Sequence, residues 1–446
     1  MQINLTKSIK LNGVQILALG FLITIAVGTI ILALPISSAS GEGTNILDAA
    51  FTATSAVCVT GLVTLNTSTH WSLFGQITII TLIEIGGLGF MSFTTFIAIL
   101  LRKKITLRER LVMQEAMNTF NIQGLVKMVR YVFGFTFGVQ ILGALLLSTQ
   151  FVPQYGVVKG LYYSIFHSIS AFCNAGFDLF GTSLTTYYDN SVVILVISAI
   201  IIIGGIGFTV WMEMYEYKGL KKLSVHSKLV LLVTAVLLFG GAILMFIFEF
   251  RNPETLGAMG FKDKALNSFF ASVTARTAGF NSISIPDMST AGNFLTIILM
   301  FIGGSPGSTA GGLKTTTFGI VVLTVISVIR GREDTEVFGR RFSKHLVYKA
   351  FSLFFIGMGL IITVTMLLSY TETGATFMDL LYETTSAFGT VGVTTGLTPN
   401  LSDVGKILIM FMMYFGRVGP LTVALAMTRN KKNSGYKYPE AKILIG

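Results

Sequence analysis

Four short polar segments, each built around a glycine, contain the residues of this sequence best suited to chemistry. They lie between long apolar stretches, and their central glycines stand 115, 103 and 113 residues apart. We call them the glycine runs: 58–62 (CVTGL), 173–177 (CNAGF), 276–280 (RTAGF) and 389–393 (GTVGV). Glycine allows backbone conformations that point carbonyl oxygens inward, and a ring of such oxygens can replace the water around a cation. The regular recurrence predicts a repeated unit.

The composition indicates a membrane protein. Hydrophobic residues make up 52% of the 446 residues and charged residues only 12%, with a mean hydropathy of +0.74. This leaves too little polar surface for a soluble chain of this length. Stretches near the length that spans a bilayer predict eight crossing helices. These stretches are 14–34, 72–101, 131–149, 191–212, 229–248, 291–329, 350–369 and 405–427.

Shorter apolar segments precede the glycine runs, at about 46–57, 159–172, 263–275 and 376–388. They are too short to cross a bilayer, so we expect them to enter from one side and return. Irregular backbone is tolerated at membrane depth where it lines a cavity or is buried in protein, which favours convergence of the four runs on one axis. The predicted fold is all-α, with four consecutive helix–pore loop–helix repeats around a pseudo-fourfold pore. The expected boundaries are 14–102, 127–218, 226–330 and 346–428, between cytoplasmic ends at 1–13 and 429–446.

Lysine and arginine gather at both ends of the chain and in the segments 102–130, 218–228 and 330–349. The intervening loops hold few cations and several acids. Positive residues mark the cytoplasmic side, so both termini are expected inside the cell. The same bias accounts for the net charge of +11 without a nucleic-acid partner.

A second glycine-rich signature follows each run after 24–28 residues, at 86–90, 204–208, 303–307 and 416–420. In the third repeat it extends over 303–316 and includes a proline, so we expect the helix to break there. The break is a candidate gate, and the alternative is a kink supported by neighbouring helices. Its candidate residues are Gly303, Gly304, Ser305, Pro306, Gly307, Ser308, Thr309, Ala310, Gly311, Gly312 and Lys314.

Two arginines stand out against the apolar background. Arg417 takes the place that Gly87 and Gly205 hold in the first two repeats, and an intramembrane charge suggests a function. We expect its side chain to face the cavity and oppose cations; pairing with Glu84 is the alternative. Arg276 precedes the third glycine, and we expect it to pack behind the run against an acidic residue.

No catalytic constellation is evident. The four histidines are isolated, and two cysteines, Cys58 and Cys173, cannot form a disulfide framework. No nucleotide-binding fingerprint is present, because Leu313 separates Gly312 from Lys314 where a phosphate-binding loop needs glycine followed by lysine. We therefore expect no enzyme and no organic cofactor in this chain.

The four-repeat pattern with one glycine per run resembles the Trk/Ktr/HKT superfamily of potassium transporters, over about residues 14–427. Within it, the short basic ends and the broken third repeat look most like KtrB-type membrane subunits of bacterial Ktr systems. The resemblance implies a homodimer in the bacterial plasma membrane, with one pore per subunit. It also implies an octameric cytoplasmic RCK-type partner that binds ATP or ADP, K⁺ as the transported ion, and Na⁺ as a possible activator.

The resemblance also assigns roles to residues. It implies a gating loop at 303–316 with Arg417 beside it, and Gly61 favours potassium because some plant relatives with serine there prefer sodium. The implied K⁺-coordinating carbonyls belong to Val59, Thr60, Gly61, Asn174, Ala175, Gly176, Thr277, Ala278, Gly279, Thr390, Val391 and Gly392.

Two other functions remain open from the sequence. A sodium-permeable or cation-coupled transporter would use the same backbone sites. A secondary carrier for an organic solute could also use re-entrant segments, although such carriers usually relate their repeats by inverted topology, whereas these four run in the same sense.

Overall fold

The computed structural model describes residues 13–101, 125–217 and 223–419. The predicted cytoplasmic tail, nearly all of the predicted N-terminal segment and the basic loop 102–110 lie outside these ranges. Each repeat contains an outer helix, a short helix and an inner helix, in that order. The outer helices are α1 (Gly13–Ala33), α6 (Leu125–Tyr155), α10 (Val225–Glu249) and α14 (Lys344–Thr371).

The short helices lie close to their predicted positions. They are α2 (Ile46–Cys58), α7 (Val157–Phe172), α11 (Phe261–Thr274) and α15 (Phe377–Gly389). Each contributes a phenylalanine with at most 1% of its surface exposed, namely Phe51, Phe172, Phe270 and Phe388. The core therefore lies around the short helices, and the outer helices surround them.

The inner helices are interrupted. They are α3 (Leu73–Leu88) with α4 (Phe90–Leu100), α8 (Ser191–Ile206) with α9 (Phe208–Tyr217), α12 (Thr290–Phe301) with α13 (Thr315–Ile329), and α16 (Asp403–Val418). The remaining elements are the short turns η1 (Pro35–Ser37), η2 (Thr185–Tyr187), η4 (Pro253–Gly257) and η5 (Thr398–Asn400), and the hairpin β1 (Glu336–Val337) with β2 (Arg340–Arg341).

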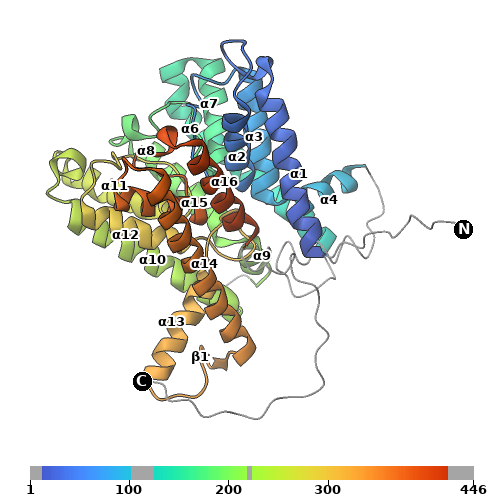
Figure 1. Ribbon diagram of the computed structural model, residues 1–446. Coiled ribbons are helices and arrows are strands. Elements are labelled where there is room, and N and C mark those ends of the chain that lie inside the picture. The colour runs from blue at the N-terminus through green and yellow to red at the C-terminus, as the bar shows by residue number, and fades with distance from the viewer. Residues whose placement is uncertain (1–12, 102–124, 218–222, 420–446) are drawn as a thin grey trace, which may run out of the picture.

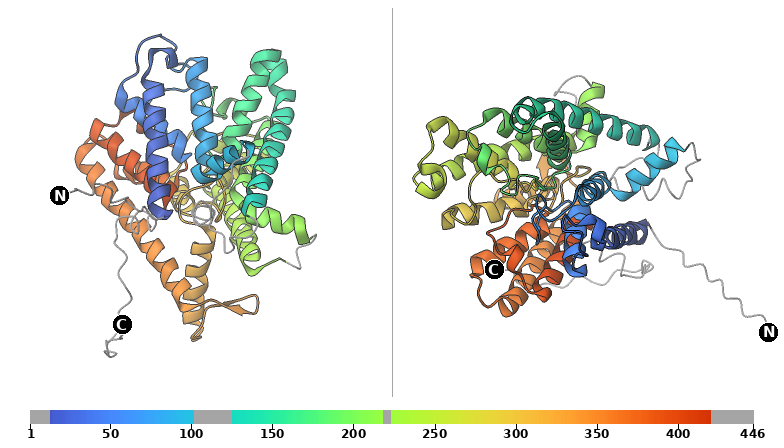
Figure 2. Two further views of the ribbon diagram at one scale, coloured as in Figure 1. Left: turned by 90° about the vertical axis from the view of Figure 1, so that its right-hand side faces the viewer. Right: turned by 90° about the horizontal axis from the view of Figure 1, so that it is seen from above.

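Seen from above, the four repeats surround a common centre in chain order (Figure 2, right). The ribbon passes from blue through teal and yellow-green to orange-red around that centre. Helices α13 and α14 extend away from the body and carry the β1–β2 hairpin at their far end (Figure 1). In the hairpin Glu336 pairs with Arg341, and Val337 with Arg340.

The structure adds detail to the eight predicted spanning helices, which divide into continuous outer helices and interrupted inner helices. Among the described residues, four helices are long and apolar enough to cross a membrane unbroken, and all four are outer helices. Two inner helices pass the same test as bent pairs, with angles of 98° between α3 and α4 and 90° between α8 and α9. The third inner helix is divided by a loop, as the sequence predicted.

The unforeseen bends depend on single glycines. Gly89, Gly207 and Gly419 end α3, α8 and α16 with φ of 82°, 102° and 92° and ψ of 133°, 136° and 130°. This is a conformation that side chains other than glycine disfavour. The last glycine of the repeated signature is therefore the point at which the inner helix stops in three repeats.

A polar side chain caps the start of the inner helix in each repeat. Ser72, Ser289 and Ser402 each accept the N–H of the residue three positions later, at the start of α3, α12 and α16. In the last two repeats a glutamate at the end of the outer helix accepts from the same serine: Glu249 from Ser289 and Glu372 from Ser402. These bonds join each outer helix to its own inner helix.

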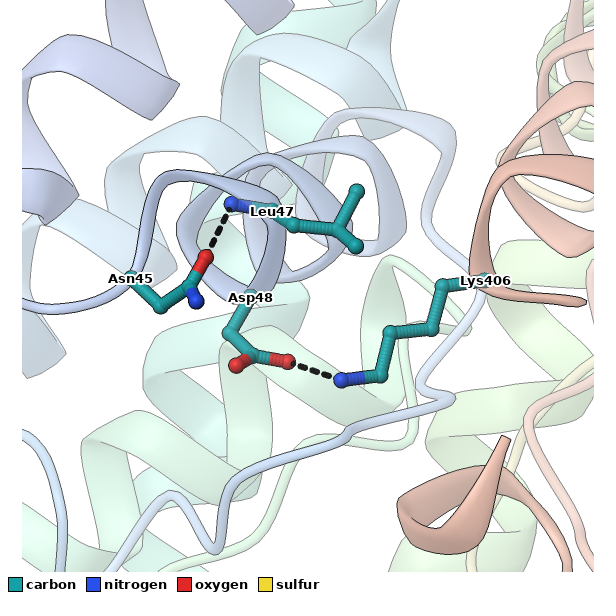
Figure 3. A network of polar contacts seen from close by, with 4 residues as sticks. All are labelled: Asn45, Leu47, Asp48 and Lys406. Atoms are coloured by element: carbon teal, nitrogen blue, oxygen red, sulfur yellow. Dashed lines mark hydrogen bonds and ion pairs between the residues drawn. The ribbon is translucent and has the colours of Figure 1, made fainter. Parts of the chain in front are cut away.

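Neighbouring repeats are joined in one rotational sense. The inner helix of each repeat contacts the short helix of the next, in the pairs α3–α7, α8–α11, α12–α15 and α16–α2. The last pair closes the ring between the fourth and first repeats. There Lys406 Nζ donates to Asp48 Oδ1 at 2.8 Å (Figure 3). Asp48 lies in the first turn of α2, and Asn45 caps the start of this helix by accepting the N–H of Leu47.

We expect Lys406→Met to destabilise the protein by about 1–3 kcal/mol, because it leaves Asp48 with 17% side-chain exposure and no cation. Adding Asp48→Asn should restore part of the loss. Thermal unfolding of the detergent-solubilised chain measures both effects. The matched control is Arg332→Met, which breaks a pair whose side chains are both 53% exposed and should change little. Equal effects of the two single variants would contradict a special role for ring closure.

Candidate functional site

The four glycine runs meet backbone to backbone around the centre. A Cβ added to the glycine of one run would lie against the carbonyl oxygen that precedes the glycine of the next run. The distances are 2.4 Å from Gly61 to Ala175, 3.0 Å from Gly176 to Ala278, 2.8 Å from Gly279 to Val391 and 2.1 Å from Gly392 to Thr60. These four contacts join each repeat to the next, and the last contact leads from the fourth repeat back to the first. Residues predicted from separate parts of the sequence are thus brought into one closed ring.

All four runs share one backbone pattern. The glycines have φ between 69° and 94°, and the residues two positions earlier also have positive φ, namely Val59 at 57°, Asn174 at 59°, Thr277 at 70° and Thr390 at 51°. Positive φ at alternate residues turns successive peptide groups in the same sense, as a carbonyl-lined ion path requires. Each non-glycine residue held there costs about 1–3 kcal/mol, and three of the four are β-branched.

Hydroxyl groups on the short helices hold this strained backbone. Ser55 Oγ accepts the N–H of Gly61 at 3.0 Å, and Ser386 Oγ accepts that of Gly392 at 3.1 Å. Ser170 and Thr274 donate to the carbonyls of Phe177 and Phe280, just after the second and third glycines. The sequence analysis missed these four residues, although a hydroxyl five or six positions before each glycine could have revealed them.

The electrostatics at the ring favour a cation. Four short helices end at the runs, and each C-terminus carries a partial negative charge. The hydroxyl oxygens of Thr60 and Thr390 are buried and have no hydrogen-bond partner among the described residues. Backbone carbonyls, hydroxyls and helix C-termini are donors that suit K⁺ or Na⁺ as a transported substrate.

The second and third runs contain one further polar contact and one buried arginine. The Asn174 amide lies 3.3 Å from the Thr277 hydroxyl and so links the two repeats. Arg276, which was expected to pack against an acid, is buried but takes part in none of the ion pairs of the described residues, and its Nε has no hydrogen-bond partner. It therefore leaves an uncompensated charge behind the third run.

Asp178 organises the loop after the second run. Its Oδ1 accepts the N–H groups of Phe180 at 2.9 Å and Gly181 at 2.6 Å. Burial raises the pKa of the Asp178 carboxyl, and these N–H groups act in the opposite direction. The acid thus supports the shape of the loop next to the ring.

The glycine-rich segment of the third repeat forms a loop between α12 and α13, and we call residues 303–314 the central loop. Its ends are held together because Gly303 N–H donates to Leu313 at 2.8 Å and Thr315 N–H donates to Gly304 at 3.1 Å. Within it, Lys314 Nζ donates to the Ala310 carbonyl at 2.7 Å. The segment is irregular but well bonded.

The central loop lies against the other repeats beside the ring. Thr309 Oγ1 donates to the carbonyl of Phe172, the last residue of α7, at 3.0 Å. Ser305 N–H donates to Gly205, and Gly312 N–H donates to Gly416. A Cβ on Gly311 would lie 2.2 Å from Thr390 Oγ1, in the fourth run. The loop therefore contacts the second and fourth repeats at the ends of their short helices.

The remaining candidate loop residues take part in these contacts or lie beside them. Ser308 Oγ donates to the Ser305 carbonyl at 2.7 Å. The Gly307 carbonyl accepts from Phe208 N–H at 2.9 Å, and a Cβ on Gly207 would lie 2.7 Å from the Pro306 carbonyl. The central loop thus fills the angle of the α8–α9 bend.

Arg417 fixes the loop to the first repeat. Its guanidinium donates to the carbonyls of Thr309 and Gly86, and to that of Gly87 at 2.9 Å. It lies among backbone oxygens at the inner-helix breaks. The alternative ion pair with Glu84 is not formed: Glu84 Oε2 accepts from Gln140 at 2.9 Å and from Cys173 Sγ at 3.3 Å.

The inner-helix signature has a packing role that the sequence did not show. A Cβ on Gly86, Gly204 or Gly416 would lie 2.0–2.1 Å from the carbonyl oxygen of Val57, Phe172 or Phe388, respectively. Each of these oxygens belongs to the last turns of the short helix in the same repeat. The first glycine of the signature therefore lets the inner helix touch the end of the short helix directly.

Comparison with known proteins fits this ring of four repeats. The family model described as TrkH, cation transport protein, matches residues 12–436. The chain belongs to the TrkH family of cation transport proteins. It is a multi-pass membrane protein with several apolar helices. Among the described residues, no group of three or more His, Cys, Asp or Glu side chains could hold a metal ion.

Relatives match the TrkH-family chain over nearly its whole length. It is 48% identical to the potassium/sodium uptake protein NtpJ of Enterococcus hirae, covering 98% of each chain. It is 41% identical to the Ktr system potassium uptake protein B of Bacillus subtilis, covering 99% of this chain and 98% of the relative. The crystal structure of the potassium transporter TrkH from Vibrio parahaemolyticus has the same fold, with a TM-score of 0.74 and 16% identity over 96% of this chain and 87% of that one.

We expect Gly416→Ala to destabilise the protein by about 1–3 kcal/mol, because the new methyl group would meet the Phe388 carbonyl at 2.0 Å and push α16 away from α15. The control is Gly359→Ala in α14, where a Cβ meets nothing within 4 Å and a helical alanine is favourable. Thermal unfolding in detergent compares the two. Identical behaviour of both variants would argue against the close approach.

Proposed function

We propose that this protein takes up potassium ions through the ring of glycine runs, which acts as the selectivity filter. The closed cycle of contacts from Gly61 through Gly176, Gly279 and Gly392 carries this proposal. In this filter the backbone carbonyls of the twelve K⁺-coordinating run residues named above replace the water around the ion. Membership of a cation transport family and relatives named as potassium uptake proteins support the assignment.

Each run has one glycine with positive φ and adopts one pattern of alternating positive φ. A short path of this kind offers few coordination sites, so we propose moderate selectivity for potassium over sodium. A relative named as a potassium/sodium uptake protein supports keeping sodium as the second candidate ion. The same experiment distinguishes the two.

We expect Gly61→Ser to erode ion selectivity, because a side chain at φ 94° would meet the Ala175 carbonyl at 2.4 Å and displace the neighbouring run. The measurement is radioactive rubidium uptake into proteoliposomes with potassium or sodium as competitor. In the parent, potassium should compete far better than sodium, and the ratio should fall at least about tenfold in the variant, which corresponds to about 1.4 kcal/mol.

The control for this variant is Gly359→Ser, at an open position of α14. It should leave the competition ratio unchanged. Equal competition by sodium and potassium in the parent would favour the sodium-permeable alternative. Absence of any cation flux would favour a carrier for an organic solute.

We further propose that the central loop is the gate. It crosses beside the ring and holds to the second and fourth repeats through Thr309, Ser305 and Gly312, while Arg417 links it to the first. Opening would require these bonds to be released together. The proposed gate consists of the residues from Gly303 to Gly312, with Lys314 and Arg417.

Arg417 can act as a fixed charge or as a clamp, and the contacts favour a clamp because one guanidinium reaches three carbonyls. We expect Arg417→Lys and Arg417→Gln both to raise uptake severalfold, since neither side chain reproduces the planar set of five donors. The rate of rubidium uptake into proteoliposomes, driven by a saturating potassium gradient, measures this increase. If lysine preserved parental flux while glutamine raised it, the charge rather than the clamp would be the operative feature.

A relative named as part of a Ktr system supports a proposal about regulation and assembly. We propose a homodimer in a bacterial plasma membrane with both termini in the cytoplasm, docked on an octameric RCK-type subunit that binds ATP or ADP. The α13–α14 hairpin supports this, because Arg332, Arg340 and Arg341 are exposed at the end of the two helices farthest from the ring (Figure 1).

A further inference from the structure

A cavity of about 550 Å³ lies between the first and second repeats. Its walls come from α3, α4, α6 and α7. Apolar side chains line most of it, including Phe93, Phe137, Ala144 and Ile169. Ile141, Leu145 and Ile165 also border it and are 61%, 59% and 50% exposed, so the cavity adjoins the outer, lipid-facing surface.

The junction around this cavity is the loosest of the four. Fewer residues of α3 and α7 come together than in the pairs α8 and α11, α12 and α15, or α16 and α2. One side-chain bond between them, from Tyr162 OH to Gln76 Oε1 at 3.0 Å, lies near the start of α3. Farther along α3 a space remains between the two helices, and the cavity occupies this space.

One acidic residue, Glu84, lines the cavity. It stands twelve residues into an apolar helix, about 18 Å from the Ser72 cap. Its Oε2 accepts from Gln140 and Cys173, but its Oε1 is buried and has no hydrogen-bond partner. Glu84 takes part in none of the ion pairs of the described residues.

An acid at this depth is costly unless a cation or a donor compensates it. The nearby Arg417 does not serve, because its guanidinium is engaged by the carbonyls of Gly86, Gly87 and Thr309. Only Oε1 therefore has room for a further donor, and the cavity is large and apolar enough to admit one from the lipid phase.

We propose that this cavity is a binding site for a hydrophobic amine, an amphiphile with a single alkyl chain and a protonated amino group. The chain lies along Ile141, Leu145 and Ile165, and the ammonium group pairs with the Glu84 carboxylate, whose buried Oε1 has to turn toward the cavity to accept it. A neutral lipid chain would fill the same walls but would leave the acid without a cation, so the carboxylate selects the amine.

The site is coupled to the glycine runs by one contact. Cys173 Sγ donates to the same carboxylate at 3.3 Å, and Cys173 directly precedes Asn174, the residue of positive φ in the second run. A Cβ on Gly87 would lie 2.8 Å from this sulfur, so the packing around it is tight. An amine on Glu84 therefore binds one residue away from the ring.

The test uses the full chain in phosphatidylcholine nanodiscs and a dodecylamine derivative with a photoreactive diazirine in its chain. The matched probe is the corresponding dodecanol derivative. We expect the amine to label peptides from α3, α6 and α7, with unlabelled dodecylamine competing at least about tenfold better than dodecanol. Binding is read without ion flux, so the result is independent of the proposed transport function.

Two variants keep the proposal falsifiable. Glu84→Gln should abolish the preference for the amine while labelling by the alcohol persists. Ala144→Phe should reduce labelling by both probes, because its ring fills the cavity without touching the carboxyl group, and it serves if Glu84→Gln fails to fold. Equal labelling by both probes in the parent, or unchanged amine labelling in both variants, would overturn the proposal and leave an ordinary lipid contact.

Discussion

The structure depends on a contact between four backbones. At the centre, each glycine of the ring lies so close to the carbonyl before the next glycine that no Cβ fits. This closeness constrains where the short helices end, because Val59 and Thr390 follow directly after α2 and α15, and Asn174 follows α7 after one residue. The inner helices then approach those termini through glycines of their own. Glycine, with no side chain, is thus required both where the runs meet in the ring and where the inner helices meet the short helices.

Around that centre the helices divide into two kinds. Outer helices α1, α6, α10 and α14 are continuous and long enough to cross a membrane, whereas each described inner helix bends, breaks or stops at the end of its glycine signature. The breaks leave carbonyls and N–H groups without helical partners, and Arg417 and the central loop provide those partners. The third repeat differs from the others because its break is long enough to reach across to the second and fourth.

Much of the architecture could be predicted from the sequence. The short helices follow from apolar segments too brief to span a bilayer, and the break at 303–314 follows from five glycines and a proline. The bends at Gly89 and Gly207 were missed because glycines are common in membrane helices and the sequence does not reveal their φ. The partners of Arg417 lie on segments 108 and 330–331 residues away, which no local pattern encodes. Val59 and Thr390 illustrate the same limit, since a β-branched residue normally argues against positive φ.

The ion pair between Asp48 and Lys406 also bears on how the molecule is made. The two residues are 358 positions apart, and they join the first short helix to the last inner helix. At a synthesis rate of about 5–20 residues per second, roughly 20–70 s pass between the appearance of the two partners. During that interval the side of α2 that receives α16 lacks this neighbour, because α16 has not yet been synthesised. The ring is therefore open throughout most of translation, and a factor that shields this side of α2 would act before the ribosome finishes.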